Sequence, residues 1–391
     1  MVAVLCALSG GFERFRYSIL TPPIMRRLTW LLLVASAVLI LVRARRSARV
    51  VRDLWPNLLL VAFALASVAW SAAPAATLRG VLALSASSVF AIYVAGRFSR
   101  LEQIDLLHWS LVIVAYSAVA AVVSGSQGIW NEQGLQAWFT SKNHLGRCMS
   151  LAVLSSLVSF FTPGRRIFPV ATGVLCLAVL IASSSRSATL VMLTCVAGFG
   201  VLCMAQSSGK RAGRVLLGGV AIAGALLALA LWHSEQVLAW LGRDVTLSTR
   251  TIIWRLLFER WKEHPWLGYG YAAFWGGPHS PGGEVGEALH YYPWHAHNGF
   301  IDLALDLGAA GLLSFTVILA IYGLRALRTG LCARVRWALW PAAYIGWFIA
   351  SNLTESELMR HDSLYWVVYL LAVAQIASLA RAQARDARGG G

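Results

Sequence analysis

Charged side chains are scarce in this chain of 391 residues: only 13% are Asp, Glu, Lys or Arg, whereas 58% are hydrophobic. A soluble domain carries roughly 25% charged residues. So apolar a chain cannot cover its folded surface with groups that water solvates, and most of that surface must face lipid. The composition excludes a soluble globular protein and favours an integral membrane protein.

Acidic residues are the scarcer of the two signs, with 17 Asp and Glu against 33 Lys and Arg, for a formal net charge of +16. In a soluble protein such an excess would suggest a nucleic-acid partner. Here the arginines cluster in short loops between apolar runs, where positive charge marks the cytoplasmic side of a membrane. We therefore expect membrane lipids as partners and no nucleic acid.

Cysteine is infrequent too. The chain has six cysteines, most of them inside or beside apolar runs, and no two of them form a Cys-x-x-Cys pair. Neither a disulfide framework nor a cysteine metal site is expected from this pattern. We expect no cofactor.

Long apolar runs dominate what the sequence does contain. A membrane-spanning helix needs about 20 apolar residues, with a usual range of roughly 17–25. The runs predict an all-α polytopic membrane protein with about 11–12 transmembrane helices. The first run is short, and a re-entrant hairpin is its alternative. The runs are 28–42, 54–73, 78–96, 105–124, 145–161, 168–184, 187–205, 214–232, 299–322, 334–351 and 363–380.

These runs divide the chain into five parts. They are an N-terminal segment (1–24), an N-terminal transmembrane bundle (25–232), a long loop (233–298), C-terminal transmembrane helices (299–380) and a tail (381–391). Charged residues interrupt the first segment, which also lacks a clean signal-peptide cleavage site. Met25 opens a more usual start, so we expect residues 1–24 to be dispensable.

Basic residues alternate from loop to loop. The basic loops are at 43–52, 97–100, 165–166, 210–214, 325–336 and 381–388. By the positive-inside rule, these loops and the C-terminus are cytoplasmic. The N-terminus is left open, because Arg26 and Arg27 argue for the cytoplasm and strict alternation argues against it. We expect an inner-membrane protein with 233–298 as a periplasmic loop and its chemistry on the periplasmic face. The other outer segments are 74–77, 125–144, 183–187 and 352–362.

Two short outer segments carry candidate site residues. Lys142, with Asn143 and His144, is a cation at the mouth of a helix on the side where the rule disfavours one. Arg186 lies among serines in a turn of a few residues, where helix N-terminal N–H groups and an arginine can bind an anion. The alternatives are a solvated loop end with a helix cap, and an arginine that reaches lipid headgroups.

The long outer loop contains a segment, 249–263, with the pattern of an amphipathic helix on the membrane surface. Thr249 is its expected N-cap, and Pro265 ends it. Arg250 and Arg255 would bind phosphate or simply lipid headgroups. The expected apolar face consists of Trp254, Leu257, Phe258 and Trp261.

Two histidines precede the span at 299–322. His295 and His297 point in different directions unless the backbone turns. They could chelate a metal, but the sequence shows no Asp, Glu or Cys placed to complete the site, so we expect no metal. A histidine at a membrane boundary is a good proton acceptor near neutral pH, and a buried structural histidine is the alternative. Asn298 and Asp302 are further candidates.

The candidate cations share one side of the membrane. The topology, drawn without reference to them, places the following on the outer face: Lys142, Arg186, Arg250, Arg255, His295 and His297. A cationic pocket suits a phosphate or pyrophosphate. A histidine beside it would add a base.

Several motifs together resemble the O-antigen ligase/polymerase superfamily, and they cover essentially residues 25–380. The motifs are Trp70-Ser71, Lys142-Asn143-His144-Leu145-Gly146, Ser185-Arg186-Ser187, the run from Arg250 to Trp254, the run from Lys262 to Gly270 with Phe274, and His297-Asn298 with Gly308 and Gly311.

The resemblance implies a metal-independent, inverting glycosyltransferase on the periplasmic side, whose donor is a glycan on undecaprenyl pyrophosphate. It implies that Arg186 and Arg250 hold the pyrophosphate and that His297 assists the attacking hydroxyl. The acceptor would be a second lipid-linked repeat in a polymerase or lipid A-core in a ligase. The chain has no Asp-x-Asp pair to hold a metal–nucleotide sugar, which agrees with a lipid-phosphate donor.

Two departures favour an exopolysaccharide or O-antigen polymerase over a ligase. Gly311 follows Gly308 more closely than the second glycine of many ligases does, and the Lys142-Asn143 signature is more similar to exopolysaccharide polymerases. A lipid-linked glycan transporter is a further alternative, although the spans within 54–124 are nearly uncharged. Other acid or base candidates are Glu284, Glu287, Asp302 and Asp362.

Overall fold

The structure is a computed structural model that describes residues 1–8, 44–126, 130–131, 134–164, 166–219, 221–222, 246–277, 279–361 and 363–389. Within this part, six helices are long and apolar enough to cross a membrane. They are α4 (Ala44–Ala66, continued to Ala69 by the 3-10 turn η1), α5 (Pro74–Arg97), α6 (Arg100–Val123), α9 (Arg186–Ser207), α14 (Gly299–Cys332) and α16 (Leu364–Gly389). The chain is an all-α polytopic membrane protein, as predicted.

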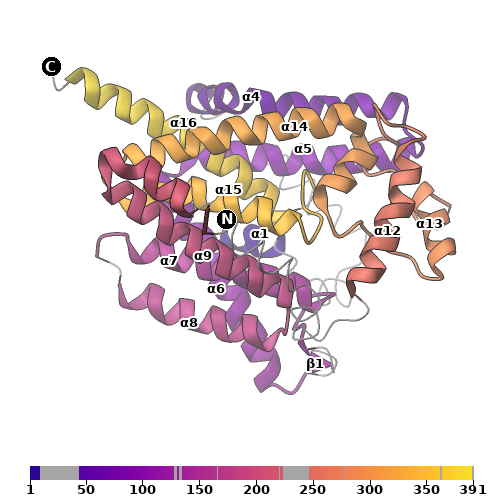
Figure 1. Ribbon diagram of the computed structural model, residues 1–391, viewed down its shortest axis with the longest axis horizontal. Coiled ribbons are helices and arrows are strands. Elements are labelled where there is room, and N and C mark those ends of the chain that lie inside the picture. Colours follow the sequence, from indigo (N-terminus) through magenta and orange to yellow (C-terminus); the bar gives the residue numbers. More distant parts are fainter. Residues whose placement is uncertain are drawn as a thin grey trace.

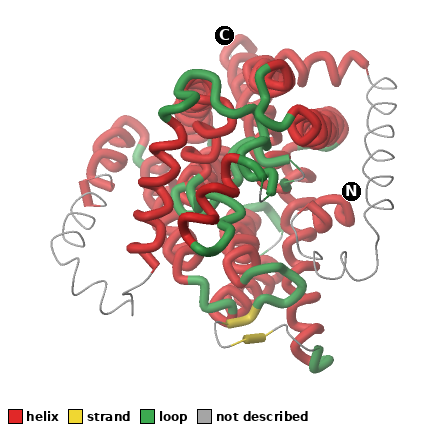
Figure 2. Tube along the Cα trace, turned by 90° about the vertical axis from the view of Figure 1, so that its right-hand side faces the viewer, coloured by secondary structure: helices red, strands yellow, loops and turns green. Residues whose placement is uncertain are grey.

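Shorter elements complete the bundle. They are α1 (Val2–Leu8), α7 (Lys142–Phe160), α8 (Ile167–Ala182), η2 (Gly209–Arg211), α12 (Thr246–Trp261), α13 (Pro281–Leu289), η3 (Arg336–Leu339), α15 (Trp340–Asn352) and an antiparallel pair of short strands, β1 (Trp130–Asn131) and β2 (Gly134–Leu135). In Figure 1, α4, α5 and α14 lie along one side, α7, α8 and α9 along the other, and α15 and α16 between them. Figure 2, viewed from the end that carries α12 and α13, shows loops gathered there.

The centre of the bundle is built from α15 and α16. Their largest side chains are almost inaccessible, among them Trp340, Tyr344, Trp347, Trp366 and Tyr369. Phe348 and Tyr369 stack across the two helices with ring centroids 5.3 Å apart. Aromatic contacts of this kind add to the burial of apolar area. α15 and the N-terminal half of α16 are therefore enclosed by protein.

The outer helices expose apolar side chains. Large exposed residues include Val174 and Ile181 on α8, Leu190 and Leu193 on α9, and Leu313, Val317 and Leu324 on α14. In water, contiguous exposed apolar surface on this scale would promote association. In lipid these side chains meet a solvent as apolar as they are.

Gly308 breaks α14, and the backbone of the loop after α12 binds at this break. Its φ of 64° and ψ of −169° interrupt the helix. The freed N–H groups that follow, of Ala309 and Ala310, donate to the carbonyls of Pro265 and Trp266 at 2.8 and 3.1 Å. A Cβ at position 308 would collide with the backbone of Trp266. The loop after α12 is thereby fastened to α14 through its backbone.

The spans differ from expectation mainly at their ends. α4 begins at Ala44, ten residues before the expected 54, and includes four arginines of the basic loop. α15 has 13 helical residues, because η3 takes up the start of the expected 334–351. α16 continues past residue 380 to Gly389. The expected span at 28–42 and the second half of 214–232 lie outside the described residues.

The helix expected at 249–263 is α12, which begins three residues earlier, at Thr246, and ends at Trp261. Ile253 and Leu257 are buried, with Trp254 and Trp261 packed beside them, whereas Phe258 is 52% exposed. The buried face packs against α13 and α14. One face of α12 therefore packs on protein. Phe258 does not belong to that buried face, but its ring stacks on Trp261.

Candidate functional site

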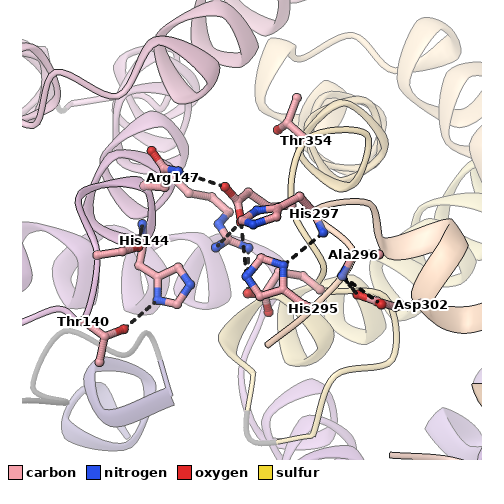
Figure 3. Close-up of polar contacts among 12 residues, drawn as sticks. Thr140, His144, Arg147, His295, Ala296, His297, Asp302 and Thr354 are labelled. Carbon is pink, nitrogen blue, oxygen red and sulfur yellow. Dashed lines mark hydrogen bonds and ion pairs between the residues drawn. The ribbon is translucent and has the colours of Figure 1, made fainter. Parts of the chain in front are cut away.

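Residues from four separate segments meet at the end of the bundle that carries α12 and α13. They come from the start of α7, the turn before α9, the residues before α14 and the loop after α15. Figure 3 shows the side chains of His144, Arg147, His295 and His297 pointing toward one another. We call this group, with Asn143, Ser185, Glu355 and Glu357, the histidine–carboxylate cluster.

Glu355 is the centre of the cluster and was not among the sequence candidates. It is 4% exposed. Asn143 donates from Nδ2 to its Oε1 at 3.2 Å, and Ser185 Oγ donates to Asn143 Oδ1 at 3.0 Å. Its Oε2 lies 3.6 Å from His297 Nδ1 and 3.9 Å from Arg147 Nη2. One carboxylate thus joins α7, the turn before α9 and the histidine segment.

The electrostatics of the cluster favour the ionised form of this carboxylate. Burial would raise the pKa of Glu355, but the neighbouring His297 and the charge of Arg147 outweigh it and hold the pKa below its ordinary range. Glu355 is therefore a buried carboxylate that carries negative charge at neutral pH.

A second buried carboxylate, Glu357, fixes Arg147. Arg147 Nη1 donates to Glu357 Oε1 at 2.6 Å, and Ser363 Oγ donates to Oε2 at 2.8 Å. The side chains of Arg147 and Glu357 are 4% and 8% exposed. Burying such a pair costs desolvation, which close geometry and additional hydrogen bonds offset. The ion pair fastens the loop after α15 to α7 and so places Glu355.

The histidine segment is a tight turn. His297 has a positive φ of 53°, uncommon for a residue with a side chain. Its backbone N–H donates to His295 Nδ1 at 3.1 Å, and the two ring centroids lie 4.1 Å apart. The backbone turn therefore brings both rings toward Glu355, which the spacing of two would not do in an extended chain.

Asn298 and Asp302 hold this turn in place. Asn298 is the N-cap of α14 and accepts from Phe300 and Ile301 N–H at 3.0 and 3.3 Å. Asp302 Oδ1 accepts from the N–H of Ala296 at 3.0 Å and from Trp275 Nε1 at 2.8 Å. Both candidates therefore have structural partners in the described structure.

The tautomer of His295 follows from the same contacts. Burial lowers the pKa of His295 well below its ordinary value, and His297 adds to the effect, while Glu355 opposes it. The ring is neutral at pH 7. Because Nδ1 accepts an N–H, the ring proton is on Nε2, which faces Glu355 Oε2 at 3.8 Å.

A carboxylate does lie beside the histidines, contrary to the sequence interpretation. Ligand atoms of His144, His295 and Glu355 all lie within 4.8 Å of one another. A metal at His295 Nε2 would have to replace the ring proton while Nδ1 still accepts its hydrogen bond. Asn143 and Arg147 also engage the carboxylate. The donor set fits hydrogen bonding better than metal coordination.

The predicted cations differ in how closely the structure places them to the histidine–carboxylate cluster. Lys142 and Arg186 are the first residues of α7 and α9. Burial and then the charge of Arg186 lower the pKa of Lys142, so the two cations lie close enough to interact. Arg186 is exposed and has no ion pair among the described residues.

The two arginines of α12 differ. Arg250 is one turn before Trp254, whose Nε1 donates to the carbonyl of Ala296 at 2.8 Å. Residues four apart share a helix face, so Arg250 is on the side of α12 that adjoins the histidine turn. Arg255 is exposed and makes no ion pair with the described part of the cluster. The structure gives Arg255 less support as a site residue.

A cavity of about 220 Å³ adjoins His295. Two tryptophans, Trp275 and Trp294, line it together with Arg360 and Asp302. Trp294 is 73% exposed. Aromatic rings beside charged hydrogen-bonding groups can contact the two kinds of surface that a sugar presents.

Comparison with known proteins agrees with the resemblance found in the sequence. The family model described as O-antigen ligase matches residues 171–316, which include Arg186, Arg250 and both histidines. The exopolysaccharide production protein ExoQ of Rhizobium meliloti (strain 1021) is 28% identical over 274 residues. The match covers 66% of this chain and 61% of that relative, about three-fifths of its length. Similarity to the O-antigen ligase/polymerase superfamily is thus confirmed.

Proposed function

We propose that this chain, which is similar to O-antigen ligases and polymerases, is a metal-independent inverting glycosyltransferase at the periplasmic face of the inner membrane. Its donor is a glycan on undecaprenyl pyrophosphate, and its acceptor is a second lipid-linked repeat. The observation that carries the proposal is the His297–Glu355 pair, 3.6 Å apart, at the end of the bundle where Lys142, Arg186 and Arg250 lie.

His297 is the proposed general base. Its Nδ1 faces the buried carboxylate of Glu355, which leaves Nε2 for the acceptor hydroxyl. The hydroxyl oxygen attacks the anomeric carbon as its proton passes to Nε2, and the carbon–oxygen bond to pyrophosphate breaks. The pyrophosphate departs with the bonding electrons and stays on its lipid. Glu355 stabilises the imidazolium that forms. Attack opposite the leaving group inverts the anomeric centre.

The cations stabilise the leaving group in this proposal. Negative charge increases on the pyrophosphate as the bond breaks, and Arg186 and Arg250 present guanidinium groups suited to phosphate oxygens. Arg186 is exposed, so it is accessible to a lipid headgroup. Lys142 adds a third positive charge beside it.

The test is a reconstitution in bilayers. The full chain receives a lipid-pyrophosphate-linked repeat from the same cell, and gels report product length. We expect a ladder of polymers that His297→Ala, Arg186→Ala and Arg250→Ala abolish. The matched control is His279→Ala, since His279 is exposed and outside the cluster. Normal product from all three site variants, or no product from the wild type with authentic substrates, would overturn the proposal.

An O-antigen ligase is the second candidate, and the description of the matching family favours it. Its acceptor would be lipid A-core. In the same bilayers a ligase gives no ladder from the lipid-linked repeat alone and a single transfer once lipid A-core is added. The two activities therefore separate in one experiment.

A further inference from the structure

A large cavity lies at the opposite end of the bundle from the histidine–carboxylate cluster. Its volume is about 1210 Å³, and residues of α4, α6, α14, η3 and α16 line it. Figure 1 shows α14 and α16 running from the α12 end to this end. Five arginines and two aspartates are among the lining residues: Arg52, Arg100, Arg325, Arg328, Arg334, Asp53 and Asp386. We call this the arginine cavity.

The positive charge of this cavity is poorly compensated within the described structure. Asp53 is already neutralised, because Arg381 donates to both of its carboxylate oxygens at 2.6 and 2.8 Å. Only Asp386 is left to oppose the five arginines of the lining. A cavity with this balance attracts an anion.

Arg100 gives the most direct evidence that the cavity suits an anion, which would accept its hydrogen bonds. Its Nη1 is buried and has no hydrogen-bond partner among the residues that the structure describes. Its guanidinium lies over the ring of Trp337, 5.5 Å from the centroid, which holds the group at the cavity wall. A buried charged donor without an acceptor is costly. An anion in the cavity would supply the missing acceptor.

Much of the remaining wall is apolar. Trp55, Ile318 and Ile321 line the cavity beside the arginines. Trp55 is 58% exposed and Ile321 43% exposed. A ligand that satisfies both surfaces carries an anionic head and a hydrocarbon tail. Basic pockets between transmembrane helices suit the phosphate headgroups of anionic lipids.

We propose that the arginine cavity binds an anionic phospholipid. The headgroup phosphate contacts Arg100, Arg325 and Arg328, and an acyl chain lies against Trp55 and Ile321. This site is separate from the proposed glycan transfer at the other end of α14, and its ligand is recognised by charge and not by a sugar. A free phosphate shares the headgroup chemistry but lacks the tail.

The test is native mass spectrometry of the full chain with phosphatidylglycerol, phosphatidylcholine or inorganic phosphate. We expect retained phosphatidylglycerol, little phosphatidylcholine, and at least a tenfold loss of phosphatidylglycerol in the R100Q/R325Q/R328Q variant. The matched control, R166Q/R211Q/R214Q, removes the same charge from exposed positions outside the cavity and should retain the lipid. Equal loss in both variants would overturn the proposal, as would displacement of the lipid by millimolar inorganic phosphate.

A single substitution guards against misfolding of the triple variant. Arg334→Glu reverses one exposed charge in the loop before η3. We expect weaker phosphatidylglycerol retention than in Arg211→Glu, which lies outside the cavity. Identical retention in the two variants would contradict the assignment of the lipid to this cavity.

Discussion

At the scale of single residues, Glu355 is the group on which the other polar contacts of the cluster depend. It accepts from Asn143, lies beside Arg147 and faces both histidines. It touches no reacting atom in the proposed reaction and is therefore a positioning residue. Its charge orients His297 and stabilises the imidazolium.

Replacing this charge should slow transfer without weakening donor binding. For Glu355→Gln we expect kcat to fall by roughly 100-fold, with KM for the lipid-linked donor nearly unchanged, because the amide keeps the size but not the charge. Initial rates in bilayers measure both constants. Glu355→Asp should recover part of the rate. The matched control is Glu287→Gln at an exposed glutamate of α13. A rate for Glu355→Gln equal to this control would rule out the role.

The same carboxylate should make stability depend on pH. Burial alone would raise the pKa of Glu355, but His297 and Arg147 lower it by more. The pKa in the folded protein is therefore below its ordinary value. A depressed pKa gives stability that is present above the unfolded value of about 4.3 and lost as the pH falls below it. We expect the melting temperature of the wild type to exceed that of Glu355→Gln at pH 6, and the gap to shrink toward pH 3. A constant gap would contradict this linkage.

Sequence reasoning found the cations and the histidines because charge beside apolar runs is conspicuous. It missed Glu355, Glu357 and Arg147, although 352–362 was recognised as an outer segment. Arg147 falls inside an apolar run, and its partner Glu357 is 210 residues away, so no local pattern connects them. Asn298 and Asp302 were candidates for chemistry, and the structure shows why such residues occur there: one caps a helix and the other holds a turn.

At the scale of elements, the shortest ion pair between α7 and the loop after α15 joins Arg147 to Glu357. Arg147→Ala would leave the buried Glu357 with only the partly exposed Arg360, 3.5 Å away, and would remove the arginine beside Glu355. We therefore expect a loss of about 3–5 kcal/mol in the free energy of unfolding. Denaturant titration in micelles measures it. The double variant Arg147→Ala/Glu357→Ala should recover part of the loss, because the carboxylate closest to Arg147 is removed with it, whereas Glu355 still loses its longer contact. A double variant less stable than either single one would contradict the pairing.

The break in α14 also makes a prediction. Gly308→Ala forces a side chain into a positive φ and against the backbone of Trp266, so we expect a loss of about 1–3 kcal/mol. The loop after α12 should detach, which limited trypsin digestion near Lys262 would report. Gly323→Ala, in the same helix with ordinary φ and only Ile345 nearby, is the control. Equal digestion of the two variants would show that the contact between the loop after α12 and α14 does not depend on Gly308.

The sequence predicts a helix well where the chain has a long apolar run. It predicts less well those features that depend on tertiary contacts, such as the buried face of a helix or a break within it. Five of the described helices, α5 to α9, both start and end within five residues of their runs, because lipid thickness limits the length of an apolar run. Periodicity cannot tell whether protein or lipid covers an apolar face, so it did not show that Ile253 and Leu257 of α12 pack on protein while Phe258 is exposed. The break at Gly308 depends on carbonyls of a distant loop, which sequence spacing does not reveal.

At the scale of the whole molecule, the two ends differ in chemistry. The cluster of histidines and carboxylates lies at one end of α14, and the arginine cavity lies at the other. The alternation of basic loops predicts that the first end is periplasmic and the second cytoplasmic.

Cysteine labelling tests that orientation. In a Cys332→Ser background, which removes the exposed cysteine, we expect a membrane-impermeant maleimide to label His279→Cys in intact spheroplasts. Arg388→Cys should be labelled only after permeabilisation, at least tenfold more than before. The opposite pattern would place the histidine end in the cytoplasm and overturn the periplasmic assignment.

The order in which the cluster's parts occur along the chain has a consequence during synthesis. A ribosome makes α7, the turn before α9 and both histidines before it reaches Glu355, and α16 follows later still. Until then His297 lacks the carboxylate that faces it, and Arg147 lacks both Glu355 and Glu357. An unfinished or prematurely terminated chain therefore inserts most of its helices without a complete site, and completion of the last two helices is what assembles it.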